Sequence, residues 1–416
     1  MRVRFPWPGL HPAIYWIAVA AFVLRVVARL MQGIDNFWTN GYTFFFELAQ
    51  SIAAGKGVAL ANGAPTAFRV PLYPILLAGL TLGHTWVWPV VVAEALIGAG
   101  TCICAAILTS EILGAPRGEI AATLAAAVTA IYPYYVVHDT ALQETSLFTL
   151  LTLIAVILAL RVTRTGARLP AVWCGLVLGL DVLTRSPIAP FAMIVPLWLM
   201  ARKRFAPSVL CALVLAATVS PWLIRNSLLT GEPVLTTEAG FELWNANNPM
   251  LFDYYPMQSV DVSINAHLDM LEAQDAKDLP PPGSSDVVVD RWFRQRALAY
   301  IRAHPWLTVV SGFRKIGATF DWLPTPRRSH AQTVLHLLSF GPVMLFGLWG
   351  MWRRRLHWRD DSLMYLLFAQ FLVVTAVYFG QTNHRVFLDV YLIVFAAAAI
   401  SDRLVRPVQN HSAFPP

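Results

Sequence analysis

Apolar runs long enough to form membrane-spanning helices recur along this chain, from Ile14 to Ile400. A helix satisfies its own backbone hydrogen bonds, so about 20 apolar residues can cross the hydrocarbon core of a bilayer. Of the 416 residues, 57% are hydrophobic and only 13% are charged, which excludes a soluble protein of this length. The sequence predicts an all-α integral membrane protein, a polytopic bundle of about ten to eleven transmembrane helices with interfacial helices in its outer loops.

Ten runs are predicted to span the membrane: 13–31, 86–112, 119–137, 145–162, 171–185, 187–201, 207–228, 333–352, 362–380 and 386–402. The first lacks a small-residue cleavage pattern, so it is expected to remain as a span and not to be removed as a signal peptide. A further run, 71–84, is shorter than a full span. It is either a re-entrant or interfacial helix, which its length favours, or a sign of an additional hidden crossing.

Basic residues indicate which span ends face the cytoplasm. The net charge of +7 comes from arginines in short links between apolar runs, as the positive-inside rule expects, and does not indicate nucleic acid as a partner. With the Met1 end, the links expected on the cytoplasmic side are Arg161/Arg164/Arg168, Arg202/Lys203/Arg204, Arg353/Arg354/Arg355 and Arg403/Arg406. The expected location is a bacterial inner (plasma) membrane, with the active site facing the periplasm.

Four stretches are then left on the outer face and must build the site: 32–70, 138–144, 229–332 and 381–385. The run from Phe44 to Ala54 in the first stretch is amphipathic and suits an interfacial helix. The predicted parts are an N-terminal transmembrane catalytic module (1–228, with the first outer loop 32–70), an outer segment (229–332) and a C-terminal transmembrane module (333–416). The Pro-rich stretch 279–285 is expected to be an irregular linker.

The four cysteines all lie inside apolar runs, where cysteine most often packs as a small hydrophobe. We therefore infer neither a disulfide nor a metal site from them.

Two boxes after one predicted span resemble a known family. Pro221-Trp222-Leu223-Ile224-Arg225-Asn226 is followed by the box that runs from Gly240 to Pro249. Both resemble segments of the polyprenol-phosphate-sugar-dependent glycosyltransferases of GT-C type, which include protein O-mannosyltransferases and lipid A aminoarabinose transferases. Weaker matches, in the family's order, are Glu47-Leu48-Ala49 with Gly55-Lys56-Gly57, Arg69 to Pro74, Gln143-Glu144-Thr145, Gly179 to Arg185, and His384-Arg385.

The resemblance implies transfer of a hexose or pentose from a polyprenyl-phosphate donor to a glycan, lipid or protein acceptor, with inversion at the anomeric carbon. Membrane lipids are the other expected partner. No residue spacing here is typical of a dedicated metal site, so no cofactor is expected to be required, and a divalent cation is the weaker alternative.

The family's catalytic base is an aspartate in the first outer loop, and this sequence departs from that pattern. Asn40 or Gly41 stands at the corresponding position, and neither accepts a proton in this role. The carboxylates nearest to it are Asp35 and Glu47. Glu144, in the short link before a span, is the stronger candidate, because ionisable groups at membrane depth are costly and tend to mark sites. Two hypotheses stay open: a displaced base, or loss of this chemistry.

The alternative for Glu144 is a carboxylate favoured by the helix dipole at a helix start. For the donor phosphate, the candidates are Arg69, Arg225, Arg385, His384 and Lys315. A guanidinium fork binds phosphate oxygens well, but an arginine at a span end also snorkels to the interface without any other role. The lysine alternatively rests on lipid headgroups, and the histidine alternatively forms only hydrogen bonds.

The candidates for an acceptor or sugar groove are Asn40, Asp139, Asn247 and Asn248. The last two amides alternatively cap a turn. Two pairs of opposite charge at i,i+4 spacing, Asp181 with Arg185 and Arg385 with Asp389, are expected to neutralise each other within the membrane.

Three other functions compete with a transferase. A transporter would show inverted repeats with broken helices, and no repeat is visible. A catalytically impaired relative that binds lipid carrier is supported by the missing first-loop aspartate. A polyprenyl-linked oligosaccharide ligase or polymerase is the nearest enzymatic alternative.

Overall fold

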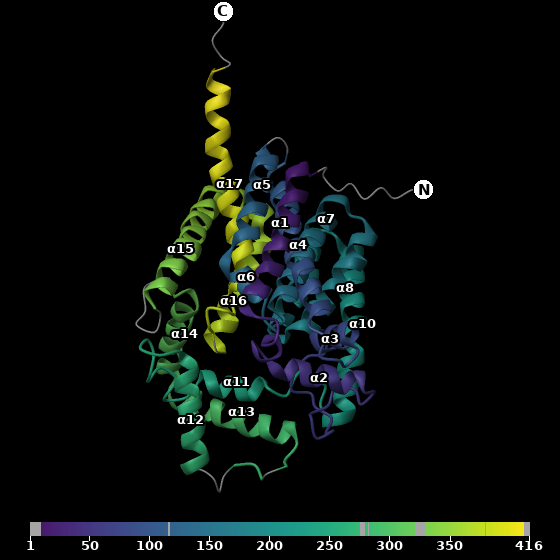
Figure 1. Ribbon diagram of the computed structural model, residues 1–416, viewed down its shortest axis with the longest axis vertical. Helices are drawn as coiled ribbons and strands as arrows, with labels where there is room; N and C mark the ends of the chain where they lie inside the picture. The colour runs from purple at the N-terminus through teal and green to yellow at the C-terminus, as the bar shows by residue number, and fades with distance from the viewer. Residues whose placement is uncertain are drawn as a thin grey trace, which may run out of the picture.

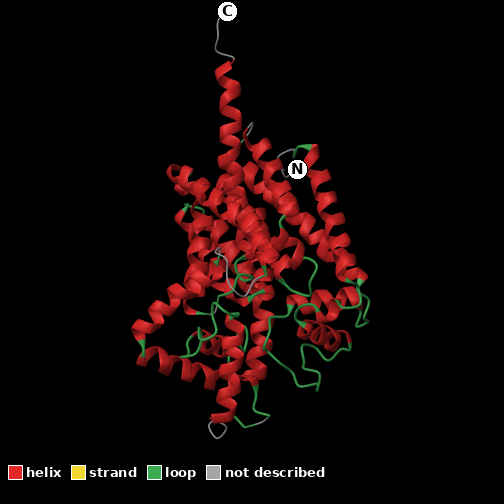
Figure 2. Ribbon diagram, turned by 60° about the vertical axis from the view of Figure 1, so that its left-hand side comes forward, coloured by secondary structure: helices red, strands yellow, loops and turns green. Residues whose placement is uncertain are grey.

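The computed structural model describes residues 10–114, 117–274, 279–281, 283–321, 329–378 and 380–411. The Met1 end, residue 282 of the predicted linker and the side chain of Arg406 lie outside the described residues. Within these ranges every regular element is a helix, and β-structure is limited to isolated bridges between Gly41 and Leu142 and between Ala59 and Pro65 (Figure 2). The predicted all-α class is confirmed.

Each predicted span coincides with a helix. The spans are α1 (Pro12–Gln32), α4 (Trp88–Leu113), α5 (Arg117–Ile131) continued by α6 (Pro133–His138), α7 (Thr145–Thr165), α8 (Arg168–Thr184), α9 (Ala189–Ala201), α10 (Phe205–Thr230), α15 (His330–Arg353), α16 (Trp358–Val377) and α17 (Val386–His411). Six of them, α1, α4, α7, α10, α15 and α16, are long and apolar enough to cross a membrane by themselves. The chain is a multi-pass membrane protein.

The shorter helices gather at one end of the bundle, below the spans in Figure 1. They are α2 (Thr43–Ala53), α3 (Leu72–Thr81), α11 (Ala239–Ala246), α12 (Val260–Gln274), α13 (Asp286–Ala303) and α14 (Pro305–Phe320), with short 3-10 turns η1 (Phe37–Thr39) and η2 (Ser186–Ile188). The third 3-10 turn, η3 (Arg355–His357), joins α15 to α16 at the other end. In α2 the side chains of Phe45, Phe46 and Leu48 are buried while Glu47 and Gln50 are exposed, so this run is amphipathic as predicted.

The short helix α3 does not cross the bundle. After it the chain returns to the end from which it came, because the indole Nε1 of Trp38 in the first outer loop donates to the carbonyl of Thr85 at 3.1 Å. At ten residues α3 is also too short for a crossing. The re-entrant or interfacial alternative for 71–84 is therefore the correct one, and no hidden crossing is needed.

The three described basic links meet at the opposite end of the bundle. Arg204 donates through Nε to the carbonyl of Thr163 at 2.8 Å. Arg202 donates to the carbonyl of Arg359, and Arg354 donates to that of Ile112 at 3.3 Å. These three links thus share one end, where α1 begins and α17 ends (Figure 1).

The centre of the bundle is formed by α7 and α17. Most side chains of α7 are buried, as expected for a helix that is apolar on all sides, and every side chain from 386 to 399 in α17 is buried. Because α17 packs against α4, α5, α7 and α15, the predicted C-terminal module is part of the same bundle as the N-terminal one.

Candidate functional site

The four stretches predicted to face outward touch one another at the end opposite the basic links. The backbone N–H of Thr237 donates to the carbonyl of Ala67 at 3.0 Å, which joins the long outer segment to the first loop. The Nε of Arg385 donates to the carbonyl of Thr319 at 3.0 Å, which joins the turn before α17 to the same segment. Side chains from distant parts of the sequence therefore share one region.

The first loop pairs directly with the link before α7. Leu142 donates its N–H to the carbonyl of Asn40 at 2.9 Å, and Tyr42 donates to the carbonyl of Leu142 at 3.0 Å. Gly41, between them, has φ +135°, and a Cβ there would lie 2.4 Å from the carbonyl oxygen of Leu142. Only glycine fits this approach without strain. The first-loop position where the resemblance expects an aspartate thus lies beside the link that ends at Glu144.

Two buried arginines of α1 hold the beginning of that link. The Nε of Arg25 donates to the Asp139 carboxylate at 2.5 Å, and the pair is almost completely buried. One turn on, Arg29 donates to the carbonyl of Thr140 at 2.9 Å. Asp139, which the sequence suggested for a sugar groove, is therefore committed to an ion pair that anchors the link.

Glu144 is buried directly before the first turn of α7, and its side chain makes no capping hydrogen bond to that helix. Its carboxylate instead pairs with Arg185 at the end of α8, with 3.4 Å between Oε1 and Nε. The expected pair of Asp181 with Arg185 is therefore wrong. Asp181 accepts from the Thr152 hydroxyl at 2.8 Å inside the bundle, because Arg185 lies beyond the last turn of α8 with an extended backbone.

A second pair, which the sequence did not predict, lies beside Glu144. Arg69 donates through one terminal nitrogen to Oε1 of Glu238 at 2.9 Å. Burial raises the pKa of Glu238 to about 8. The positive charge of Arg69 lowers this pKa, but repulsion from Glu242 and Glu144 raises it again. Burial by itself lowers the pKa of Arg69, but the same three carboxylates outweigh it and raise that pKa.

Glu238 was missed because it lies 169 residues from Arg69 and directly before the Gly-aromatic box. A glutamate just before an expected helix is normally interpreted as a carboxylate that stabilises the start of that helix. No short-range pattern in the sequence points to its partner.

A third buried carboxylate, Glu94 of α4, lies on the membrane side of this group. It accepts from the Tyr73 hydroxyl at 2.8 Å through Oε1, and from the Ser146 hydroxyl through Oε2. With both oxygens bound to neutral donors, Glu94 joins α3, α4 and the start of α7.

The other predicted catalytic carboxylates have different surroundings. Asp35 and Glu47 are exposed, and neither makes a hydrogen bond or ion pair within the described ranges. Asn40, also predicted for the groove, donates to the Gln32 side chain at 3.3 Å. Of the three candidate bases, Glu144 is the buried and ion-paired one.

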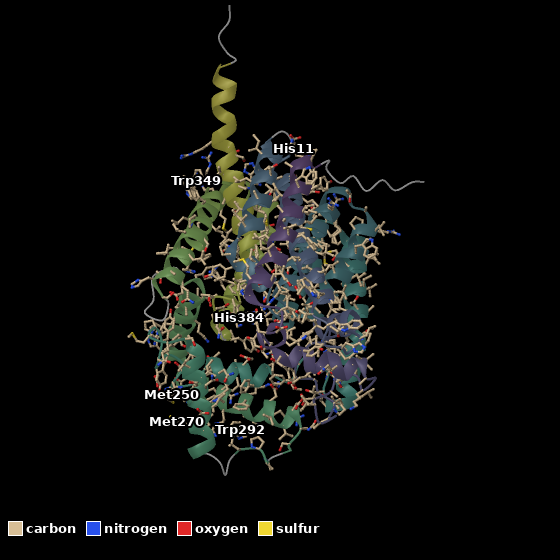
Figure 3. The ribbon with its side chains drawn as sticks, viewed as in Figure 1. His11, Met250, Met270, Trp292, Trp349 and His384 are labelled. Carbon is tan, nitrogen blue, oxygen red and sulfur yellow. The ribbon has the colours of Figure 1, made fainter. Side chains whose placement is uncertain are left out.

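The predicted phosphate-binding arginines differ in what they already bind. Arg225 donates to the backbone carbonyls of Thr66 at 2.6 Å and Val58 at 2.8 Å, and so fixes the first outer loop to α10. Arg385 is fully buried and donates from one nitrogen to both oxygens of Asp389, at 2.8 and 2.9 Å, so this predicted pair is confirmed. His384, next to it, is partly exposed in the turn before α17, near the middle of Figure 3.

Lys315, on the interfacial helix α14, is also completely buried. Its ammonium donates to the carbonyls of Ala246 at 3.1 Å and Val377 at 3.3 Å, and no carboxylate among the described residues pairs with it. Burial lowers the pKa of Lys315 to about 8. The amide of Asn247 donates to the same Val377 carbonyl at 2.9 Å, so both side chains tie the outer segment to the end of α16.

Asn248 closes the turn that follows α11. Its amide donates to the carbonyls of Trp244 and Asn245, each at 3.1 Å, and its Oδ1 accepts from the N–H of Met250 at 2.9 Å. This geometry supports the turn-capping alternative for Asn248.

An open apolar groove of about 650 Å³ lies at the outer end of α10. It is lined by Pro65, Pro221, Ile224, Arg225, Leu228 and Leu229. The described residues contain no group of three or more His, Cys, Asp or Glu side chains that could hold a metal ion.

The amino-acid sequence matches no protein-family model, and no curated protein matches it. The solved structures that match this chain include the following two. One is the apo crystal structure of an oligosaccharyltransferase from Archaeoglobus fulgidus, with 14% sequence identity and a TM-score of 0.51, covering 96% of this chain and 52% of that chain. The other is ArnT from Cupriavidus metallidurans bound to undecaprenyl phosphate, with 13% identity and a TM-score of 0.42, covering 94% and 79%. This chain thus spans about half the length of the oligosaccharyltransferase, with which it shares its fold.

Proposed function

We propose that this protein is a membrane glycosyltransferase that moves a hexose or pentose from a polyprenyl-phosphate donor to a glycan, lipid or protein acceptor. The observation that carries the proposal is the position of Glu144. It is buried two residues after Leu142, which pairs with the first-loop backbone at Asn40 and Tyr42. A carboxylate therefore stands close to where the resembling family keeps its base, although it comes from a different loop.

The groups around Glu144 suit a single displacement. Glu144 takes the proton from an acceptor hydroxyl, the oxygen attacks the anomeric carbon, and the bond from that carbon to the donor phosphate oxygen breaks. The phosphate leaves with the electron pair, and Arg69, whose side chain is 30% exposed beside the same cluster, offsets the growing negative charge. Attack opposite to the leaving group inverts the anomeric configuration.

The surroundings of the site fit a lipid-linked donor. The groove at the outer end of α10 is apolar and open, and Arg225 lines it together with the apolar side chains of Ile224 and Leu228. Arg225 also binds the carbonyl of Thr66, three residues before Arg69, so the groove and the charged cluster share one loop. The fold likeness to an oligosaccharyltransferase supports the same class of reaction.

The active site is proposed to face the periplasm of a bacterial inner membrane. The basic links meet at the opposite end of the bundle, and the positive-inside rule puts that end in the cytoplasm. No metal cofactor is proposed to be required, and full turnover in excess chelator is the expected result.

A transfer assay in proteoliposomes tests the proposal. Radiolabelled polyprenyl-phosphate hexoses and pentoses are offered with an acceptor extract to the wild type, to Glu144→Gln and to Asp35→Asn. Glu144→Gln is expected to lower turnover by about 10²–10⁴-fold. The matched control is Glu111→Gln, which removes a glutamate paired with Arg161 at the other end of the bundle and should keep most turnover.

Three results would count against the proposal in different ways. Loss with Asp35→Asn and not with Glu144→Gln would move the base to the first loop. A product with retained configuration would exclude direct displacement. Donor binding without turnover, in the wild type and with every acceptor fraction, would favour a catalytically impaired lipid-carrier-binding protein.

A further inference from the structure

The guanidinium groups beside Glu144 are not held by two hydrogen bonds to one carboxylate. At the other end, Arg354 contacts both oxygens of Asp361 through two different nitrogens, at 2.8 and 2.9 Å. Arg69, by contrast, makes one contact to Glu238, and Arg185 approaches Glu144 only to 3.4 Å. Two parallel bonds fix a guanidinium, whereas one bond leaves it able to change partner.

Glu238 also keeps an unused acceptor. Its Oε2 is buried and has no hydrogen-bond partner among the described residues. A pair that only held the outer segment in place would gain from filling that oxygen, since a buried unsatisfied acceptor is destabilising. A role that is only structural therefore does not explain the free acceptor oxygen of Glu238.

Arg69 has more than one carboxylate within electrostatic range. Glu238, Glu144 and Glu242 all act on it, and the side chain is hydrogen-bonded to the first of these. If Glu238 gave it no partner, the guanidinium would be drawn toward Glu144, which already has Arg185 on one side. A carboxylate between two guanidinium groups is a weaker base.

We propose that Glu238 is a positioning residue that holds Arg69 away from Glu144 and so keeps Glu144 available as a base. The inference rests on the proposed function for the catalytic role of Glu144. The positioning itself is a property of three side chains from three segments of the chain and is measurable without any turnover.

Other charged or titratable groups act on Glu144 from every element around it and must stay constant in a test. They are Arg185 after α8, Arg69 before α3, Tyr73 of α3, Glu94 of α4, His138 of α6, and Glu238 before α11. Of these groups, the labelling experiment changes only Arg69 and Glu238.

Labelling with dicyclohexylcarbodiimide reads the charge state of Glu144 directly, because this apolar reagent reacts with protonated carboxyl groups. The full-length protein in lipid nanodiscs is labelled over a range of pH, and the adduct on Glu144 is quantified by peptide mass spectrometry. Glu238→Met removes the acceptor that holds Arg69. We expect it to move the midpoint of Glu144 labelling by about one pH unit or more toward lower pH. Glu238→Gln, which keeps an acceptor for Arg69, should move it less.

The double variant Arg69→Gln with Glu238→Met removes the guanidinium together with its partner and should return the midpoint close to the wild-type value. The matched control is Glu232→Gln, since Glu232 pairs with Arg291 in the same outer segment and is partly exposed. An unchanged midpoint in Glu238→Met would overturn the proposal. So would equal shifts in Glu238→Met and Glu238→Gln, because the lost carboxylate, which also acts directly on Glu144, would then account for the effect without any movement of Arg69.

A stability cycle tests the same relation independently of the reagent. Arg69→Gln and Glu144→Gln should be nearly additive in thermal midpoint when Glu238 is present, and clearly non-additive in the Glu238→Met background. Equal coupling in both backgrounds would overturn the proposal. If Glu144→Gln leaves transfer intact while these shifts are seen, the proposed function fails and the positioning stands.

Discussion

Gly98, in the middle of α4, makes room for the ion pair that anchors the link leading to Glu144. A Cβ at this position would lie 2.1 Å from Nε of Arg25 and 2.3 Å from Oδ2 of Asp139. Both distances are far below van der Waals contact, and both side chains are fully packed. Gly98→Ala therefore has to separate Arg25 from Asp139, although alanine is the better helix former.

The size of the effect follows from two opposing terms. Breaking a buried ion pair and leaving its charges uncompensated costs about 3–5 kcal/mol. Replacing glycine by alanine within a helix returns about 1 kcal/mol. We expect Gly98→Ala to lower the free energy of unfolding by about 2–4 kcal/mol. Turnover should fall as well, because the displaced Asp139 begins the link that carries Glu144.

Denaturant titration in mixed micelles measures this change, with Gly341→Ala as the control. Gly341 is also within a spanning helix, and a Cβ there meets no atom within 4 Å, so this variant should be neutral or slightly stabilising. The decisive comparison uses a background with Arg25→Met and Asp139→Asn, where Gly98→Ala should lose most of its effect. An equal loss of stability in that background would refute the reasoning, as would no loss in the wild type.

Three further outcomes are expected. Lys315→Met should raise the thermal midpoint at pH 7, because burial disfavours the charged ammonium and lowers the pKa of Lys315 to about 8. In a pH series of melts, the difference in thermal midpoint between the variant and the wild type should shrink from about pH 8 to about 10.5. A difference that does not change with pH would contradict this. The pKa of Glu238 is raised from 4.5 to about 8, so wild-type stability should decline between these pH values, because the unfolded state loses this proton while the folded state still keeps it. Glu238→Gln melts should lack this component, and parallel curves would exclude it. Gly41→Ala should lower the free energy of unfolding by about 1–3 kcal/mol and reduce transfer activity, because the φ of Gly41 is positive and the Leu142 backbone leaves no room for a Cβ. The control is Gly63→Ala, where a Cβ meets no atom within 4 Å and transfer activity should be kept.

The membrane helices could be predicted from the sequence because a bilayer imposes one local rule. A span must satisfy its backbone hydrogen bonds within about 20 apolar residues, and this requirement is visible in any window of that length. For the same reason, the short length of the run 71–84 distinguishes α3 from the helices that cross the membrane. The basic links predicted which span ends lie on the cytoplasmic side. Contacts between these links, such as that of Arg204 with Thr163, agree with this prediction because they bring the links to one end of the bundle.

The site could be predicted only in part, because its contacts are long-range. Glu144 stood out as a carboxylate before a span, and the i,i+4 pair of Arg385 with Asp389 is local. Asp181 has the same spacing from Arg185, yet that pair does not form. The end of α8 turns the guanidinium toward Glu144, and no spacing rule shows where a helix ends relative to a distant loop.

The arginines predicted to hold the donor phosphate can be ranked by what each must give up to bind an anion. Arg385 has one nitrogen on both oxygens of Asp389 and Nε on Thr319, and its other terminal nitrogen has no hydrogen-bond partner among the described residues. The whole side chain is buried, so an incoming phosphate would need the surrounding helices to open. Arg225 holds two backbone carbonyls, and releasing them would free the first outer loop. Arg69 makes one bond, to Glu238, and is partly exposed, so most of its five N–H donors can meet a phosphate before that bond breaks. Donor affinity should therefore depend more on Arg69 than on the two arginines that are more firmly bound.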